Sequence, residues 1–275
     1  MTKLFFSLIL ISFQQAAFAQ YYYKDIISNS QLKVDMSSYK EKKIRNIKLN
    51  SFDYDGQPSE GFFCEKKIAK NFKKAELFTK SPGSATSLFT STFDENGNLL
   101  STSDSSEISV SRNFYSYNAS GKVSKILSTV LSSDDDFLNE ITEEHLYEYN
   151  QDGFPTSMVV VKNKRDSTRV LFSADENNNV SIEKDTKTGS KYYYYYDAKN
   201  RLTDVVHANE YRENLVAVYI FEYDDSGSIT QMTTTEEGTN NFYVWRYLYD
   251  NGLRLKERLY SKDRKLIGSI EYEYN

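Results

Sequence analysis

Few residues of this 275-residue chain have the types and spacing that catalysis needs. The chain has one cysteine, Cys64, and two histidines, His145 and His207. A thiol nucleophile with a distant histidine base is one arrangement that these residues permit. Cys64 follows two phenylalanines, which favours a small buried side chain, and His145 shares a strand face with Tyr147. No nucleophile elbow, zinc-protease helix or glycine-rich phosphate loop occurs, so we expect no catalytic residue and no cofactor.

Two acidic stretches offer oxygen ligands of the kind that calcium prefers. They are Asp134–Asp136 and the run Asp175-Glu176-Asn177-Asn178. Neither has the spacing of a calcium-binding loop, so we expect solvated turns and no metal site. Pairs of carboxylates could also hydrolyse glycans bound on aromatic side chains. A glycan-active enzyme is therefore the first alternative to a non-enzymatic protein.

An aromatic row near the C-terminus is the best candidate for a binding face. Tyr243, Trp245, Tyr247 and Tyr249 alternate with other residues, so a β-strand would place all four side chains on one face. Trp245 is the only tryptophan. Such a row could stack against sugar rings or a partner protein's side chains. The alternative is that this face belongs to the core.

The aromatic row belongs to a repeat that runs from about residue 90 to the last residue. Its clearest copy is Phe221–Ile229, which reads Phe-Glu-Tyr-Asp-Asp-Ser-Gly-Ser-Ile. Asp224 and Gly227 are the first and fourth residues of a type I turn, in which the carboxylate accepts a backbone N–H group. A glycine with positive φ completes the common three-residue hairpin loop with a bulge. In that register Tyr223 lies opposite Ile229, so the motif predicts one β-hairpin.

Other copies place Asp or Asn, and then Gly or Asn, at the same two turn positions. Asn is the residue other than Gly that best tolerates positive φ. The Asp or Asn positions recur at intervals near 25 residues, which fits two strands and two turns. The structural turn residues that we identify are Asp94, Gly97, Asn118, Gly121, Asn150, Gly153, Asp175, Asn178, Asp197, Asn200, Asp224, Gly227, Asp250 and Gly252.

These hairpins predict an all-β fold, an antiparallel meander, for residues 85–275. The motif resembles the YD repeats of Rhs-type proteins over about residues 90–275. In that family the repeats build extended, curling β-sheets that can form a shell around a cargo. The spacing here is looser, and the C-terminal toxin segment of that family is missing from this sequence. The resemblance therefore implies β-hairpin repeats and carries no toxin-delivery function.

The first 19 residues have the pattern of a signal peptide. Lys3 precedes an apolar stretch, and Ala17-Phe18-Ala19 is a cleavage site flanked by small residues. The apolar stretch is shorter than a membrane-spanning helix requires. We expect cleavage after Ala19, export to the periplasm, cell surface or extracellular space, and no transmembrane segment in the mature chain. With a single cysteine the exported chain has no disulfide framework, and its 23 Tyr and 17 Phe must supply the buried surface.

Residues 20–80 differ from the repeats in charge and pattern. Basic residues outnumber acidic ones by 12 to 7 between Lys33 and Lys80, whereas the rest of the chain is acidic. We expect a mixed segment, with an early strand at Tyr21–Tyr23, a short helix at Ser30–Tyr39 and a strand within Lys42–Asp53. Ser81–Ser84 is the expected boundary with the repeat domain. Export and the acidic remainder argue against nucleic-acid binding by the basic residues.

Three function classes follow from these patterns. The favoured class is an exported non-enzymatic β-repeat protein, a binding or structural module that contacts a protein or polysaccharide. The second is the glycan-active enzyme. The third is an outer-membrane barrel, which needs an apolar outward band, whereas the predicted strands carry Glu, Arg, Ser and Lys opposite their aromatic faces.

Overall fold

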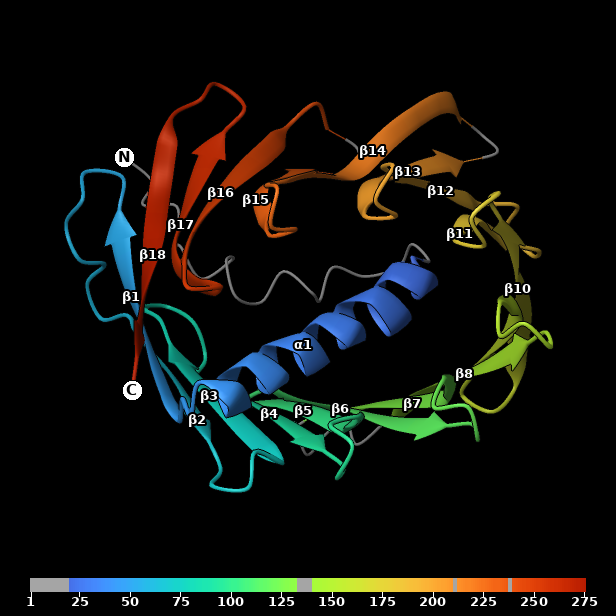
Figure 1. Cartoon of the computed structure of the whole chain (residues 1–275), viewed down its shortest axis with the longest axis horizontal. Helices are drawn as coiled ribbons and strands as arrows, with labels where there is room; N and C mark the ends of the chain where they lie inside the picture. The colour runs from blue at the N-terminus through green and yellow to red at the C-terminus, as the bar shows by residue number, and fades with distance from the viewer. Residues whose placement is uncertain (1–19, 133–139, 210–211, 237–238) are drawn as a thin grey trace.

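The strands of the protein form one closed β-barrel. The computed structural model describes residues 20–132, 140–209, 212–236 and 239–275. Each strand pairs antiparallel with the next, and β1 also pairs with β18 from Ile47↔Tyr274 to Asp53↔Gly268, which closes the sheet (Figure 1). The 18 strands are β1 (Asn46–Asp53), β2 (Phe63–Ile68), β3 (Lys74–Lys80), β4 (Ser87–Phe93), β5 (Leu99–Ser106), β6 (Ser109–Tyr117), β7 (Val123–Ser132), β8 (Ile141–Tyr149), β9 (Pro155–Lys162), β10 (Asp166–Ala174), β11 (Val180–Asp185), β12 (Lys191–Tyr196), β13 (Leu202–Asn209), β14 (Arg212–Tyr223), β15 (Ile229–Thr235), β16 (Phe242–Asp250), β17 (Leu253–Ser261) and β18 (Leu266–Tyr274).

The antiparallel meander that the repeats predict is confirmed, and its closure into a barrel is an addition to that prediction. The expected boundary at Ser81–Ser84 does not divide the sheet. It lies in the connection between β3 and β4, which pair from Lys74↔Thr92 to Thr79↔Ser87. Residues 46–80 therefore supply three strands of the same barrel, and their basic composition does not mark a separate β unit.

The N-terminal segment is helical and lies inside the ring of strands. The expected strand at Tyr21–Tyr23 is wrong: Tyr21 and Tyr22 are helical and lead into the π-helical turn η2 (Tyr23–Ile27). The helix expected at Ser30–Tyr39 is present as α1 (Ser28–Glu41). The three tyrosines pack on the inner wall instead of pairing as a strand. The ring of Tyr21 contacts His145, and the rings of Tyr22 and Tyr23 contact Phe172, Tyr194, Tyr219 and Phe221.

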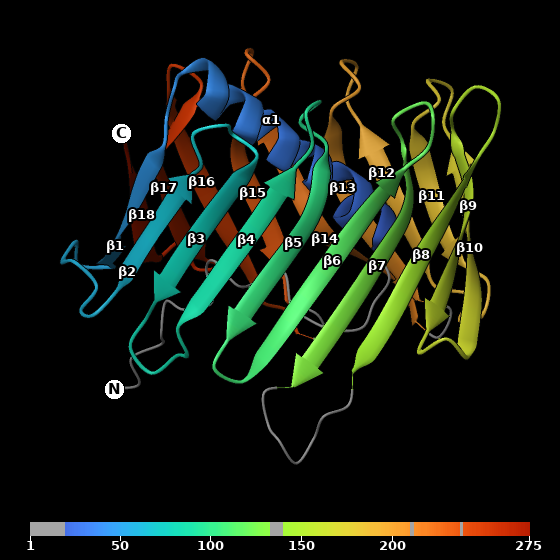
Figure 2. The same cartoon turned by 90° about the horizontal axis from the view of Figure 1, so that it is seen from below.

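The repeat turns all lie at one end of the barrel, together with α1 (Figure 2). The N–H group of Asp224 bonds the carbonyl of Ser228, and the N–H group of Gly227 bonds the carbonyl of Asp224. A register shift between Glu222 and Tyr223 places Tyr223 opposite Ile229, as the turn geometry predicts. In five such turns the φ angle is positive, as the motif predicts. It is 74° at Gly121, 77° at Gly153, 92° at Gly227, 63° at Asn178 and 57° at Asn200.

A tyrosine hydroxyl joins successive hairpins at this end. The second aromatic residue of a motif donates to a backbone carbonyl of the preceding hairpin, next to that hairpin's own turn. The five bonds measure between 2.6 and 3.0 Å and are Tyr117 to Leu99, Tyr149 to Val123, Tyr196 to Val180, Tyr223 to Leu202 and Tyr274 to Arg254. The repeat uses tyrosine here because the ring packs on the wall while the hydroxyl reaches the neighbouring strand.

Side chains alternate between the lumen and the outer surface along each strand. The lumen-facing positions that meet the N-terminal segment form two buried clusters. One cluster surrounds Tyr21–Ile27 and includes Tyr147, Met158, Val170, Tyr194 and Val205. The other surrounds Met36 and Ile44 and includes Ile47, Leu49, Cys64, Phe93 and Ile270. The core of this barrel is therefore the contact between its wall and its own N-terminal segment.

Candidate functional site in the barrel lumen

The aromatic row of β16 faces the lumen. Trp245 pairs with Met232 on one side and with Leu259 on the other, and Leu259 is a buried core residue. The row is divided into two parts. The Arg254 guanidinium lies 4.2 Å from the ring centroid of Tyr247 and 5.8 Å from that of Tyr249. All four residues are half-buried, and Tyr243 and Trp245 are the two that lie further from the repeat turns.

Arg254 belongs to a partly buried charged cluster on this wall, in which its side chain is 36% exposed and that of Glu257 is 8% exposed. It donates to Glu257, at 3.3 Å, and Glu257 accepts a 2.8 Å bond from the hydroxyl of Tyr272. Burial raises the pKa of Glu257 although Arg254 opposes the shift. The cluster fixes two of the four aromatic rings, which leaves Tyr243 and Trp245 as the part of the row that could meet a ligand.

The end of the lumen away from the repeat turns is open to water. Lumen-facing apolar side chains near this end are strongly exposed: Val130 by 41%, Ile141 by 56% and Val216 by 43%. Their cross-strand partners Ser111 and His207 are lumen-facing positions as well. The N-terminal segment therefore covers the repeat-turn end and leaves the other end accessible.

Polar side chains line the wall of β4–β7 toward the open end. Asn113 donates to the hydroxyl of Thr102 at 3.0 Å and accepts a 2.6 Å bond from the hydroxyl of Ser128. Ser87 donates to Asp104 at 2.6 Å. The open part of the lumen thus combines hydroxyl, amide and carboxylate groups with the two aromatic rings of β16, and carbohydrate-binding surfaces use both kinds of group.

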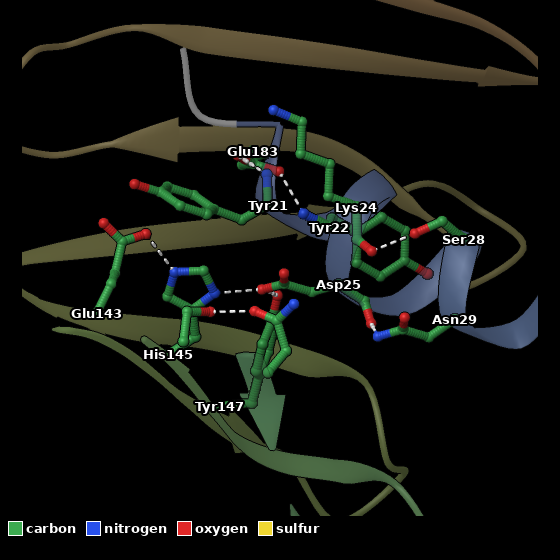
Figure 3. A network of polar contacts seen from close by, with 12 residues as sticks. Tyr21, Tyr22, Lys24, Asp25, Ser28, Asn29, Glu143, His145, Tyr147 and Glu183 are labelled. Carbon is green, nitrogen blue, oxygen red and sulfur yellow. Dashed lines mark hydrogen bonds and ion pairs between the residues drawn. The ribbon is translucent and has the colours of Figure 1, made fainter. Parts of the chain in front are cut away.

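His145 lies between two carboxylates deep in the lumen (Figure 3). Its Nδ1 is 2.6 Å from Asp25 of η2 and its Nε2 is 2.7 Å from Glu143. The hydroxyl of Tyr147 also donates to Asp25, at 2.9 Å. Burial opposes the charge of the imidazole, but Asp25 and Glu143 prevail and raise its pKa to about 10. Both ring nitrogens are occupied, so His145 holds the N-terminal segment against β8 and has no nitrogen left to act as a base.

Glu183 binds the start of the helical segment from the opposite side of this network (Figure 3). Its two carboxylate oxygens accept the N–H groups of Tyr21 at 3.0 Å and Tyr22 at 2.9 Å, and one of them also accepts the hydroxyl of Tyr194 at 2.8 Å. The first N–H groups of a helix have no partner within the helix, and Glu183 supplies one from far along the chain. Burial raises the pKa of the Glu183 carboxyl to about 7.

The remaining residues with candidate chemistry have structural positions. Cys64 is buried, its Sγ is 3.5 Å from the hydroxyl oxygen of Thr79, and burial raises the pKa of its thiol. The hydroxyl group of Ser190 is 2.9 Å from Nε2 of His207. Asp175 accepts the N–H groups of Asn177 and Asn179, which occupies the carboxylate within its own turn. The run Asp134–Asp136 lies outside the described residues.

The outer face of the barrel carries charged side chains along its strands. Lys125 lies 3.0 Å from Glu144 on the adjacent strand, and Lys256 lies 2.5 Å from Glu271. Arg169 and Glu148 form a longer contact of 3.8 Å. Ion pairs therefore lie on the outer face of these strands, beside outward apolar side chains such as Leu131 and Leu171, which are 37% and 41% exposed.

Sequence reasoning did not identify Asp25, Glu183, Arg254 and Glu257 as lumen residues. Asp25 and Glu183 are distant in sequence from their partners, Arg254 and Glu257 are three residues apart, and no local motif marks any of the four. In β17 alternation places Glu257 on the same face as Leu259, whereas in β11 it places Glu183 with Ser181 and Asp185, so alternation gives a signal for Glu257 alone. Among the residues that the structure describes, no group of three or more His, Cys, Asp or Glu side chains could hold a metal ion, and no helix is long and apolar enough to cross a membrane.

Comparisons with known proteins give only distant structural likenesses. No family model matches the chain, and no curated protein matches it. A porin-like protein from Bacteroides uniformis ATCC 8492 aligns at 12% identity and a TM-score of 0.37, over 84% of this chain and 98% of that one. The TcdB2-TccC3-Cdc42 structure aligns at 12% identity and a TM-score of 0.31, over 86% of this chain. The Photorhabdus luminescens Tc holotoxin pore aligns at 12% identity and a TM-score of 0.32. This chain spans 17% of the length of each of these two toxin chains. At TM-scores this low, none of the three carries an argument about function.

Proposed function

We propose that the mature chain is an exported, non-enzymatic binding barrel of the cell envelope or extracellular space. Its outer face stands in water, and its lumen receives a ligand at the end that the N-terminal segment leaves open. The observation that carries this proposal is the placement of Lys–Glu ion pairs on the outer wall, whereas the row with Tyr243 and Trp245 lies on the inner wall. Carbohydrate is the ligand class that fits Tyr243, Trp245 and the hydroxyl-lined wall of β4–β7 best.

The inner wall supports a binding role more than a catalytic one. His145 has carboxylates on both ring nitrogens, and the Cys64 thiol lies buried in the cluster around Met36 and Ile44. Glu183 and Glu257 are each occupied by hydrogen bonds that hold neighbouring residues in place. These groups rigidify the lumen, whereas Tyr243 and Trp245 keep ring surface accessible.

A fluorescence titration tests ligand binding directly, because Trp245 is the only tryptophan. The purified mature chain is mixed with soluble glucans, xylans and mannans, and the emission of Trp245 is followed. We expect a saturable shift with at least one glycan, and a loss of affinity in Tyr243→Ala. Tyr195→Ala is the matched control, since Tyr195 is 49% exposed and faces outward. An unchanged emission with every glycan, or equal losses in both variants, would contradict the proposal.

Barrel closure favours a second candidate, an outer-membrane barrel. A closed, antiparallel barrel with an even number of strands is the architecture of bacterial outer-membrane proteins, and 18 strands lie within their range. Lipid would, however, meet the outward charges of Lys125, Arg169 and Lys256. A lysine or arginine at the midplane costs about 2–4 kcal/mol. Heat-modifiable migration in a detergent gel, together with a requirement for detergent during extraction, would support this second candidate against the first.

A further inference from the structure

We infer that the lumen contains a binding site for the chain's own mature N-terminus, in which the α-ammonium group of Gln20 pairs with Glu183. The inference rests on the export that we propose, because cleavage after Ala19 is what creates this amine. Cleavage after Ala19 would place a protonated amine on Gln20, one residue before the two N–H groups that Glu183 already accepts. The seating of the N-terminal segment would then depend on removal of the signal peptide.

The first step of the argument is the charge of Glu183. Its side chain is 1% exposed, and the groups that bond it are two backbone N–H groups and one hydroxyl, all of them neutral. An ionised carboxylate in such a place requires a compensating positive charge. Of the charged groups around this segment, Asp25 and Glu143 are matched by His145 and Lys24, which leaves no positive charge among these four to compensate Glu183.

The second step is the position of Gln20. This residue is 8% exposed, so the point of cleavage would lie inside the barrel. Its side-chain oxygen Oε1 is buried and has no hydrogen-bond partner among the described residues. An α-ammonium group has three donors where a peptide has one, so it can serve both the free Gln20 oxygen and Glu183. A buried polar atom without a partner at the expected new terminus is an observation independent of Glu183.

The third step is what the pairing would stabilise. The carbonyl of Gln20 accepts the N–H group of Lys24, which makes Gln20 the start of the helical segment. Asp25 in the next turn bonds His145 and Tyr147. Anchoring Gln20 therefore fixes the register of the segment that fills the first buried cluster. A chain that still carries residues 1–19 would present an uncharged peptide group to Glu183 in place of the ammonium.

The test compares two forms of the purified chain, one beginning at Gln20 with a free amine and one with a Gly-Ser extension before Gln20. We expect the free form to melt at a higher temperature, and we expect Glu183→Gln to abolish the difference between the two forms. Tyr194→Phe is the control, since it removes a neutral partner of Glu183 and should preserve the difference. Lys24→Met shows whether Lys24 already supplies the compensating charge.

A second readout follows the amine itself and does not depend on any variant. Labelling with an amine-reactive reagent, followed by peptide mass analysis, should find the α-amine of Gln20 at least tenfold less reactive in the folded chain than in urea. Equal melting temperatures of the two forms, an α-amine as reactive as in urea, or exported protein that retains Met1 would each overturn the inference. None of these measurements involves a glycan, so they fail or succeed independently of the proposed binding function.

Discussion

The hydroxyl of Tyr223 donates a 2.6 Å hydrogen bond to the backbone carbonyl of Leu202, a residue of the preceding hairpin. The Arg201 guanidinium packs 4.6 Å from the centroid of the same ring. Four other tyrosines make the equivalent bond to their own preceding hairpins. The motif therefore encodes two things, a turn within each hairpin and a link between hairpins.

Removal of one such link should weaken the barrel measurably. We expect Tyr223→Phe and Tyr149→Phe each to lower the free energy of unfolding by about 1 kcal/mol, since each leaves a carbonyl without its donor. The measurement is urea denaturation followed by circular dichroism. Tyr195→Phe is the matched control and should be neutral, because Tyr195 is exposed on the outer face. Equal effects of all three substitutions would mean that the links contribute nothing specific.

The turn glycines should be sensitive to backbone conformation alone. Gly227 has a φ of 92°, and a Cβ atom added there would meet no atom within 4 Å. We expect Gly227→Val to destabilise the protein by more than about 1 kcal/mol, because valine is strained at positive φ. Gly227→Asn should cost less than half as much, since Asn178 and Asn200 occupy the equivalent turn position at positive φ. A valine variant as stable as the asparagine variant would contradict this account of the turn.

The stability of the protein should depend on pH through His145 and Glu143. The pKa of His145 is raised to about 10, so its ion pairs stabilise the fold fully below the unfolded value of about 6.5. That stabilisation is lost as the pH rises from there through about 10. The pKa of Glu143 is lowered to about 2, mainly by its hydrogen bond with His145, so its contribution is present above about 4.5 and is lost as the pH falls through about 2.

Melting temperatures measured from pH 5 to pH 10 check the His145 contribution. We expect a decline above about pH 6.5 in the native chain, and a shallower decline in His145→Gln, which keeps a hydrogen-bonding side chain but no charge. His207→Gln is the control, since the Nε2 of His207 lies beside the hydroxyl of Ser190. If His145→Gln retains the full decline, then another group is responsible for it.

The sequence predicted the hairpins well because each one depends on residues close together in the chain. Asp224 and Gly227 determine a turn, and period-two alternation determines which side chains share a face. Closure of the barrel could not be predicted in this way, since it depends on β1 and β18, which are more than 200 residues apart. The helical state of Tyr21–Tyr23 was missed for a related reason. An aromatic triplet favours a strand locally, whereas contacts with Phe172, Tyr194 and Phe221 decide its structure.

The aromatic row illustrates the same limit within the candidate site. Alternation placed Tyr243, Trp245, Tyr247 and Tyr249 on one face, and the structure puts that face in the lumen. Alternation in the sequence could not show that Arg254 covers only two of the four rings, because Arg254 lies on the next strand, after a turn and a bulge.

The central claim is that the outer face of this barrel stands in water, and thiol labelling in envelope preparations tests it most directly. Cys64→Ser gives a cysteine-free chain with little change to the core, and single cysteines are then placed at outward positions by Leu146→Cys and Val159→Cys. Ser111→Cys, at the open end of the lumen, is the reference position, because water in the lumen reaches it whether the outer face lies in water or in lipid. With a charged, water-soluble maleimide, the account predicts labelling at all three positions without detergent. Labelling of Ser111→Cys alone, with both outward positions protected until detergent is added, would show that lipid covers the outer face and would contradict the account.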